Sequence, residues 1–190
     1  MTKKIIALLL TMVMLFAFGA CSKDEDSSSE PSSSEPSLTP SANYEGSLED
    51  LMAEIYEENP VELNLGPATA IDLTDADNVN YFLGLSNADD IKEAISSEPM
   101  MSSQAYSICL VRTEDGADID TLKQDILDGI NPRKWICVAA DKVIVTNYGD
   151  VIAMIMTDSN LSTTLTDDLY NAFANVVGGE TGEKLERTSE

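Results

Sequence analysis

Carboxylates and thiols are the side chains that could do chemistry in this chain, because its sequence contains no histidine. Of 190 residues, 34 are Asp or Glu, 11 are Lys or Arg and three are Cys. Without imidazole the chain lacks the commonest general base near neutral pH and the commonest zinc ligand. Catalytic triads that use histidine are excluded. The formal net charge of -23 also disfavours binding to nucleic acid, whose phosphate groups it repels.

Two cysteines, Cys109 and Cys137, lie in apolar runs of the C-terminal half. Two interpretations stay open, namely separate thiols in the hydrophobic core or one disulfide, which an exported protein could form. We expect neither a nucleophile nor a metal-binding pair, because no histidine is present to activate a thiol. The sequence therefore predicts no catalytic residue, no cofactor and no metal ligand.

Two acidic segments could gather around a cation, but helix capping requires the same residue types. Segment 115–120 resembles a calcium loop in composition, yet its oxygen spacing and closing Glu do not fit an EF-hand. We expect Asp72, Asp75 and Asp77, with the pair at 89–90, to cap two successive short helices. Carboxylates are too abundant for any pair to stand out as the two acids of a glycosidase.

One basic cluster interrupts the acidic sequence and consists of Arg133, Lys134 and Lys142. It could contact an anionic wall polymer, but we expect its side chains to be solvated on the surface. Met100 and Met101 could form an exposed, adaptable contact surface. The interpretation that we favour is a plug of the core before a strand.

The first 21 residues have the layout of an export signal. A basic start at 1–4 precedes an apolar run at 5–18, and two small residues then lead to Cys21. The last four residues of this layout resemble the lipobox of bacterial lipoproteins, with Phe18 where Leu is usual. The resemblance implies cleavage between Ala20 and Cys21 and acylation of the Cys21 thiol. Two acyl chains would hold the protein on the outer face of the cytoplasmic membrane; an uncleaved anchor or a simple secretory signal is the alternative.

Composition divides the remainder of the chain. The segment after Cys21 contains Ser-Ser-Ser-Glu-Pro twice in succession and almost nothing that could enter a core. It is expected to be a disordered tether that spans roughly 25 Å as a coil. The predicted parts are a signal peptide at 1–20, the lipidated Cys and tether at 21–45, one domain at 46–179 and a disordered tail at 180–190.

Hydrophobic periodicity and turn residues predict the elements of the domain. Helices are expected from Ser47 to Asn59, over 75–85, over 86–97, from about 118 to 131, and from Thr163 or Thr164 onwards. Strands are expected over 106–112, 142–147 and 151–157, the last two as a hairpin. Segment 135–138 could add a short edge strand.

This order of elements predicts an α+β fold with a small, mainly antiparallel sheet. The sheet part reads strand, helix, strand, strand, helix, preceded by two or three short N-terminal helices. A helical crossover makes the first two strands parallel, and the hairpin then allows the third strand to lie between them. Strand 151–157 is apolar on both faces, as a central strand between two covered faces requires. We expect the helices after the first strand to cover one face and the N-terminal helices to cover at least part of the other.

Three motifs carry a family resemblance. They are Glu-Pro-Met-Met-Ser-Ser at 98–103 before a strand, Trp-Ile-Cys-Val at 135–138 after a helix, and Asn-Tyr-Gly-Asp at 147–150 before a hydrophobic strand. In these motifs the region 73–157 resembles small clostridial lipoproteins that carry a shared domain of unknown function, DUF4358. The resemblance implies an envelope protein of an anaerobic Gram-positive bacterium, and it implies no activity.

Three functions remain compatible with the sequence. The first is a non-catalytic binding or assembly module of the cell envelope, attached to the membrane by its N-terminal lipid and contacting an envelope protein or a wall polymer. The second is an extracytoplasmic lipoprotein that binds a cation or small ligand. The third is a carboxylate-dependent hydrolase of envelope glycans. Because no catalytic constellation stands out, we expect a protein that is not an enzyme.

Overall fold

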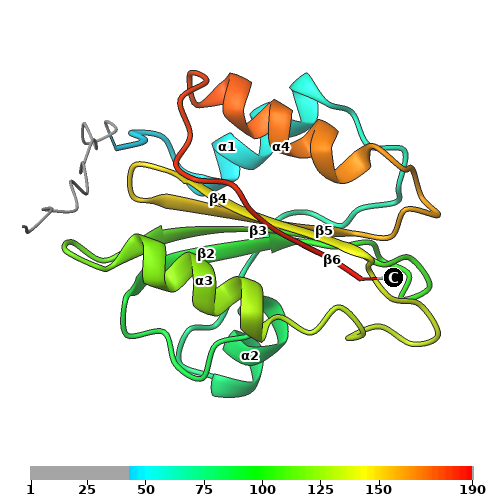
Figure 1. Cartoon of the computed structure of the whole chain (residues 1–190), viewed down its shortest axis with the longest axis horizontal. Helices are drawn as coiled ribbons and strands as arrows, with labels where there is room; N and C mark the ends of the chain where they lie inside the picture. Colours follow the sequence, from blue (N-terminus) through cyan, green and yellow to red (C-terminus); the bar gives the residue numbers. More distant parts are fainter. Residues whose placement is uncertain (1–42, 190) are drawn as a thin grey trace, which may run out of the picture. The chain divides into compact units, whose positions relative to one another are not determined.

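The computed structural model describes residues 43–189, which form a six-stranded sheet with helices on both faces (Figure 1). The predicted signal peptide, Cys21 and most of the tether lie outside the described residues. In chain order the elements are α1 (Leu48–Glu58), β1 (Thr69–Ala70), α2 (Ala76–Leu83), β2 (Ile91–Ser97), β3 (Tyr106–Thr113), α3 (Ile119–Gly129), β4 (Lys142–Tyr148), β5 (Val151–Thr157), α4 (Leu165–Val176) and β6 (Leu185–Thr188).

The sheet has the order β1-β2-β3-β5-β4-β6, and every neighbouring pair is antiparallel. The third predicted strand, β5, therefore lies between the first two, as its apolar sequence indicates. All seven of its residues are buried. Ile155 pairs with Ile108 of β3 on one side and with Ile144 of β4 on the other. The predicted α+β fold with its central third strand is confirmed.

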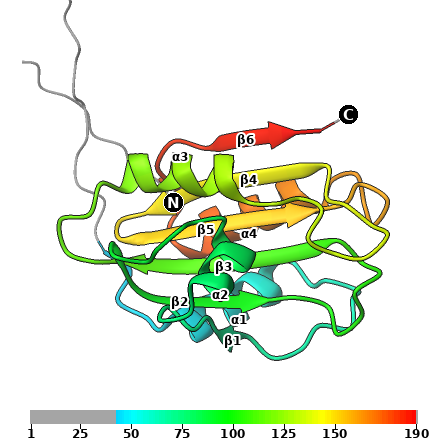
Figure 2. The same ribbon diagram turned by 90° about the horizontal axis from the view of Figure 1, so that it is seen from below.

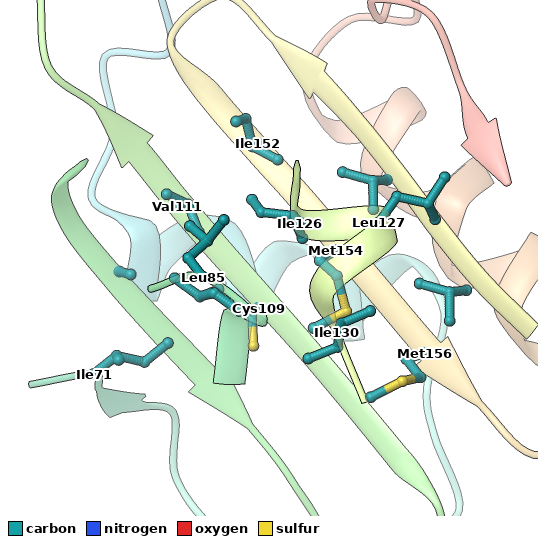
Figure 3. Packing of buried hydrophobic residues seen from close by; sticks show 14 of the residues in the cluster. Ile71, Leu85, Cys109, Val111, Ile126, Leu127, Ile130, Ile152, Met154 and Met156 are labelled. Atoms are coloured by element: carbon teal, nitrogen blue, oxygen red, sulfur yellow. The ribbon is translucent and has the colours of Figure 1, made fainter. Parts of the chain in front are cut away.

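Alternate residues of β5 enter two separate hydrophobic cores, one on each face of the sheet. Ile152, Met154 and Met156 pack with α2 and α3 in the first core (Figure 3). Val151 and Ile155 pack with α1 and α4 in the second core. Side chains of a strand point alternately to its two faces, so one apolar strand supports both layers of helices.

Each face is covered by one helix from each half of the chain, which corrects the predicted grouping. Helices α1 and α4 lie on one face, and α2 and α3 lie on the other (Figure 1). The crossovers β3-α3-β4 and β5-α4-β6 each skip one strand in the same direction across the sheet. Because β3 and β5 are antiparallel, two right-handed crossovers in that direction place their helices on opposite faces.

The predicted helix at 86–97 is wrong, since most of this segment is strand β2. A bulge sets two residues of β2, Lys92 and Glu93, against one position of β3. The extra residue brings Ile91 and Ala94 into the same core. Apolar residues three apart on one face have the spacing of a helix, and this is why the sequence predicts a helix here.

Two further predictions at the sheet edges are corrected. Segment 135–138 contains bends at 135–137 and no edge strand, and Cys137 has a φ of 66°, which a strand does not allow. The predicted tail at 180–190 contains β6, which pairs with β4 at the edge of the sheet (Figure 2). Leu185 packs against the first core, so this short, charged segment has an apolar contact that its composition does not reveal.

Candidate functional site

The side chain of Lys134 is buried where the α3–β4 loop passes the end of β2 and the start of β3. Its exposed fraction is 2%, and its Nζ lies 2.6 Å from Glu98 Oε1. The same ammonium donates to Ser107 Oγ at 3.2 Å and to the carbonyl oxygen of Tyr81 at 3.4 Å. The expectation that Lys134 is solvated is wrong. The acidic partner that makes burial tolerable, Glu98, is 36 residues away in sequence.

Three aromatic rings surround the Lys134 ammonium. The ring centres of Tyr81, Phe82 and Trp135 lie 4.5, 5.2 and 5.2 Å from Nζ. Aromatic faces attract a cation, most strongly where water is excluded. These rings and the Glu98 carboxylate together replace the hydration that the ammonium loses on burial. They tie α2, the end of β2 and the α3–β4 loop to one another.

Four exposed apolar side chains belong to the segments that supply this buried ion pair and its aromatic neighbours. Among residues 43–189, the large hydrophobic side chains that are exposed are Tyr81, Met100, Met101 and Ile136, with exposed fractions of 39, 72, 54 and 74%. Met100 and Ile136 each follow a member of the ion pair by two residues, and the Tyr81 hydroxyl donates to Glu98 Oε2 at 3.4 Å. We call these four residues the apolar surface. The favoured prediction that the two methionines plug the core is wrong.

The polar groups beneath the apolar surface are not arranged for nucleophilic catalysis. Ser107 and Lys134 have the residue types of a serine–lysine pair, but Ser107 is fully buried. The Lys134 ammonium is paired with a carboxylate and cannot accept a proton from a hydroxyl. Cys109 is fully buried, and burial raises the pKa of its thiol to about 11. The polar groups of this site are therefore buried and paired, whereas its exposed side chains are apolar.

The two thiols lie in different environments. Cys109 of β3 is buried in the first core (Figure 3), whereas Cys137 is exposed beside Ile136, and neither forms a disulfide. Of the two interpretations from sequence, separate thiols describe the structure, with the correction that Cys137 is outside the core.

The predicted basic cluster is not one surface. Lys134 is buried, and Lys142 at the start of β4 pairs with Asp167 at 2.7 Å and with Glu186 at 3.4 Å. Arg133 is exposed and has no ion pair among the residues that the structure describes. Only Arg133 is therefore available to an anionic group of a partner.

The predicted capping of helices by acidic residues is confirmed for Asp75 and Asp118, and it is wrong for the pair at 89–90, which precedes strand β2. Asp75 accepts hydrogen bonds from the main-chain N–H groups of Asp77 and Asn78 at the start of α2, and Asp118 accepts one from Thr121 in α3. Hydrogen bonds from main-chain and side-chain groups of Thr121 lower the pKa of Asp118. Within 43–189 no group of three or more His, Cys, Asp or Glu side chains could hold a metal ion.

Arg112 binds the start of the described chain at the end of the sheet opposite Lys134. Its Nε lies 2.8 Å from Glu93 Oε1 and its Nη1 lies 3.0 Å from Asp150 Oδ2. The guanidinium also donates to the carbonyl oxygens of Tyr44 at 2.9 Å and Gly46 at 2.7 Å. We call this the Arg112 clamp. It holds the last residues of the predicted tether and the first residue of the predicted domain against β3.

A polar cavity of about 420 Å³ adjoins the Arg112 clamp. Its lining includes Glu93, Asp150 and Asp115, together with the main chain at 43–47. The first two carboxylates already bind the guanidinium, whose positive charge disfavours a second cation at this place. The cavity thus gives no support to the predicted cation-binding alternative.

Most members of both clusters carry no local signal in the sequence. Tyr81, Glu98 and Ser107 have ordinary local sequences, and their meeting depends on the packing of three segments. Arg112 did give a signal, because it is the one charged residue in the apolar strand β3. A charge in such a strand requires a partner near it, and this could have directed attention to the end of β3.

No family model matches the chain, and neither a curated protein nor a solved structure matches it. The resemblance to small clostridial lipoproteins stays a prediction. Among the described residues, no helix is long and apolar enough to cross a membrane.

Proposed function

We propose that this protein is a lipid-anchored, extracytoplasmic binding module that holds another component of the cell envelope and catalyses no reaction. The anchor is Cys21, as the lipobox-like sequence implies, and the Ser/Glu/Pro-rich segment is the spacer. The observation that carries the binding function is the apolar surface of Tyr81, Met100, Met101 and Ile136.

Exposed apolar side chains on three segments that meet at one ion pair require an explanation. Single exposed hydrophobic residues are normal on a soluble domain, but a gathered group marks a surface that binds something. Methionine is common in such surfaces because its flexible, polarisable side chain adapts to a partner. Here two methionines follow Glu98, whose carboxylate is fixed by Lys134. Flexible methionine side chains next to a buried ion pair that fixes the main chain are well suited to binding.

The membrane anchor is tested by acylation and fractionation. The wild-type protein is expected to incorporate an alkynyl fatty acid and to sediment with membranes. Cys21→Ser is expected to abolish both properties, because the acylated thiol is lost. Cys137→Ser is the matched control and should behave as wild type. Fatty-acid incorporation into Cys21→Ser would contradict the proposed anchor.

The binding function is tested by cross-linking through Cys137, which is exposed next to Ile136. A benzophenone maleimide attached to this thiol in the mature Cys21→Ser protein is irradiated with envelope membranes. A defined adduct is expected, and an excess of unlabelled protein of the same sequence should suppress it. Unlabelled protein that also carries Ile136→Glu should not suppress it. Equal suppression by both competitors, or no adduct, would overturn the proposal.

A further inference from the structure

We propose that the apolar surface binds a polypeptide segment of another envelope protein, and that this segment presents apolar side chains together with Asp or Glu. This inference rests on the proposed function and names the chemistry of the partner. It follows from the distribution of charge around the surface, from the position of the surface on the sheet, and from the charge of the whole chain.

Three of the four residues of the apolar surface come from segments without acidic residues. The described residues carry 28 Asp or Glu and 8 Lys or Arg, a net charge of -20. Segments 99–113 and 129–140, which supply Met100, Met101 and Ile136, contain no Asp or Glu. Glu98, which the Tyr81 hydroxyl contacts, is paired with Lys134, and Asp77 lies one turn before Tyr81 in α2. An acidic partner that would be repelled elsewhere meets little repulsion here.

Arg133 gives this surface a positive charge. It is exposed, it stands three residues before Ile136, and it forms none of the ion pairs within 43–189. A guanidinium offers planar donors that match a carboxylate, and an Arg beside apolar anchors is a common arrangement at protein interfaces. A partner segment with both kinds of side chain would place its apolar residues against the apolar surface and its carboxylates against Arg133.

The position of the surface argues against the membrane as its occupant. The Arg112 clamp holds Tyr44 and Gly46 at one end of β3, whereas Ser107 near the other end contacts Lys134. Five residues of strand separate Arg112 from Ser107, which is about 17 Å. Figures 1 and 2 show the described chain beginning at one end of the sheet and the α3–β4 loop at the other. The described chain therefore begins at the end of the sheet opposite the apolar surface.

Charge argues against both a lipid surface and a second copy. After removal of 1–20, the chain has 34 acidic and 9 basic residues, a net charge of -25. A charge of this size is repelled by anionic headgroups and by another copy of itself. A partner segment with a few carboxylates meets Arg133 locally and carries far less total charge than a second copy does.

The probe for this inference is a phage-displayed library of random peptides, selected on the mature Cys21→Ser protein. Counter-selection uses the same protein with Ile136→Glu. The selected peptides are expected to combine aliphatic or aromatic residues with Asp or Glu. Two of them, synthesised with a fluorescent label, are then measured by anisotropy. Ile136→Glu and Met100→Glu should each weaken binding by about tenfold or more, as expected for central contacts.

The Arg133 contribution is separated by matched variants. Arg133→Ala should weaken peptide binding several-fold. Replacing Asp and Glu of the peptide by Asn and Gln should weaken its binding to the wild-type protein by about the same factor. Added salt should reduce the difference in affinity between wild type and Arg133→Ala. Lys92→Ala is the control, since Lys92 is also exposed and outside the ion pairs but lies in β2 near the clamp. Far-ultraviolet circular dichroism confirms that each variant is folded.

Several outcomes would overturn the inference. Selected peptides without acidic residues would reject the acidic partner, and so would equal binding of the peptides by Arg133→Ala and wild type. The proposed binding module would still be supported if the cross-link through Cys137 were competitive. Sedimentation with phosphatidylglycerol vesicles that Ile136→Glu abolishes would assign the surface to a membrane. Self-association that Ile136→Glu abolishes would assign it to a second copy. No peptide enrichment together with no competitive cross-link would remove the proposed function as well.

Discussion

Gly129, the last residue of α3, packs directly against the main chain of Gly84, which ends α2. A Cβ atom on Gly129 would lie 2.3 Å from the carbonyl oxygen of Gly84. Gly84 has a φ of 74°, and a Cβ atom there would lie 2.1 Å from the main-chain nitrogen of Ile130. The ends of these two helices therefore approach more closely than any side chain permits. The chain after Gly129 leads to Lys134 and Ile136, and the chain after Gly84 leads through β2 to Glu98.

Gly129→Ala is expected to destabilise the protein, although alanine is the better helix former. The propensity gain is about 1 kcal/mol, whereas forcing a methyl group into a filled space costs about 1–3 kcal/mol. The cost here lies in the upper half of that range, because the group that must move is main chain. We expect a net loss of about 1–2 kcal/mol in the free energy of unfolding, measured with urea. Gly66→Ala is the control, because its nearest neighbour would lie at 3.9 Å. Equal or higher stability of Gly129→Ala would contradict the close packing.

Arg112→Ala is expected to release the start of the described chain. The substitution leaves Asp150, whose side chain is 20% exposed, and two carbonyl oxygens without their donor. Loss of a largely buried, paired charge costs about 2–4 kcal/mol. Chymotrypsin should then cleave after Tyr44 much faster than in wild type. Arg112→Lys should recover only part of the loss, because an ammonium lacks the planar fork that reaches four oxygens. Unchanged cleavage after Tyr44 would show that the clamp does not hold this segment.

Lys134→Met is expected to be strongly destabilising, with a loss of about 3–5 kcal/mol, because it leaves the Glu98 carboxylate without its partner. Adding Glu98→Gln removes that charge and should restore most of the loss. The single tryptophan, Trp135, provides a spectroscopic signal, since its ring lies 5.2 Å from Nζ of Lys134. Its fluorescence should change in both variants. Additive losses in the double variant would show that the two side chains do not interact.

The topology was predictable because it depends on local patterns that agree with one another. The apolar strand β5 indicated a central position between two covered faces, and the turn at Tyr148-Gly149 indicated a hairpin. Where the prediction failed, a local feature imitated another structure. The bulge in β2 placed Ile91 and Ala94 at helical spacing on one face. Strand β6 is short and charged, and it is held by pairing with β4 and by Arg187, which donates to the carbonyl oxygens of Asp128 in α3 and of Ile130. Sequence does not show these contacts.

The candidate site was less predictable, because it is assembled from three separate segments. Lys134 was identified as basic, but its burial depends on Glu98 and on aromatic residues of α2. Met100 and Met101 were identified as either a contact surface or a core plug, and composition cannot distinguish the two. The absence of Asp and Glu from 99–113 and 129–140 was visible in the sequence. Its meaning appears only once the two segments are seen to flank one ion pair.

The two thiols are expected to differ sharply in reactivity. In mature Cys21→Ser protein at pH 8, Cys137 should react at once with a disulfide reagent, whereas Cys109 should react only on unfolding. Burial raises the pKa of Cys109 to about 11 from an ordinary value of 9.0. Its neutral thiol therefore supports folding fully below pH 9, and this contribution is lost as the pH rises through 11. Cys137→Ser should remove the fast phase alone. Rapid labelling of two thiols in folded protein would contradict the burial of Cys109.

The attachment of β6 is expected to depend on pH through a cluster of four charged side chains. Lys142 and Lys184 each contact both Asp167 of α4 and Glu186 of β6. Hydrogen bonds from Lys142 and Lys184 respectively lower the pKa of Asp167 and of Glu186, and the hydrogen bond to Glu186 raises the pKa of Lys184. A lowered carboxyl pKa contributes stability above the ordinary values of 3.8 and 4.5, and this contribution is lost as pH falls through the folded pKa. The raised pKa of Lys184 has the opposite sign, so its contribution is complete below 10.5 and is lost at higher pH.

Amide hydrogen exchange measures this effect. Between pH 7 and about pH 3, the protection factors of β6 amides should fall more than those of the central strand β5, because carboxyl groups of this kind are protonated in that range. Added salt at pH 7 should produce a smaller change in the same direction, since these side chains are partly exposed and therefore screened. Lys184→Gln should weaken β6 protection at pH 7 and reduce its dependence on pH, whereas Lys92→Gln, outside the cluster, should change neither. A parallel decline of β5 and β6 would show that the charged cluster does not hold the edge strand, and that Leu185 and the β4 pairing are sufficient.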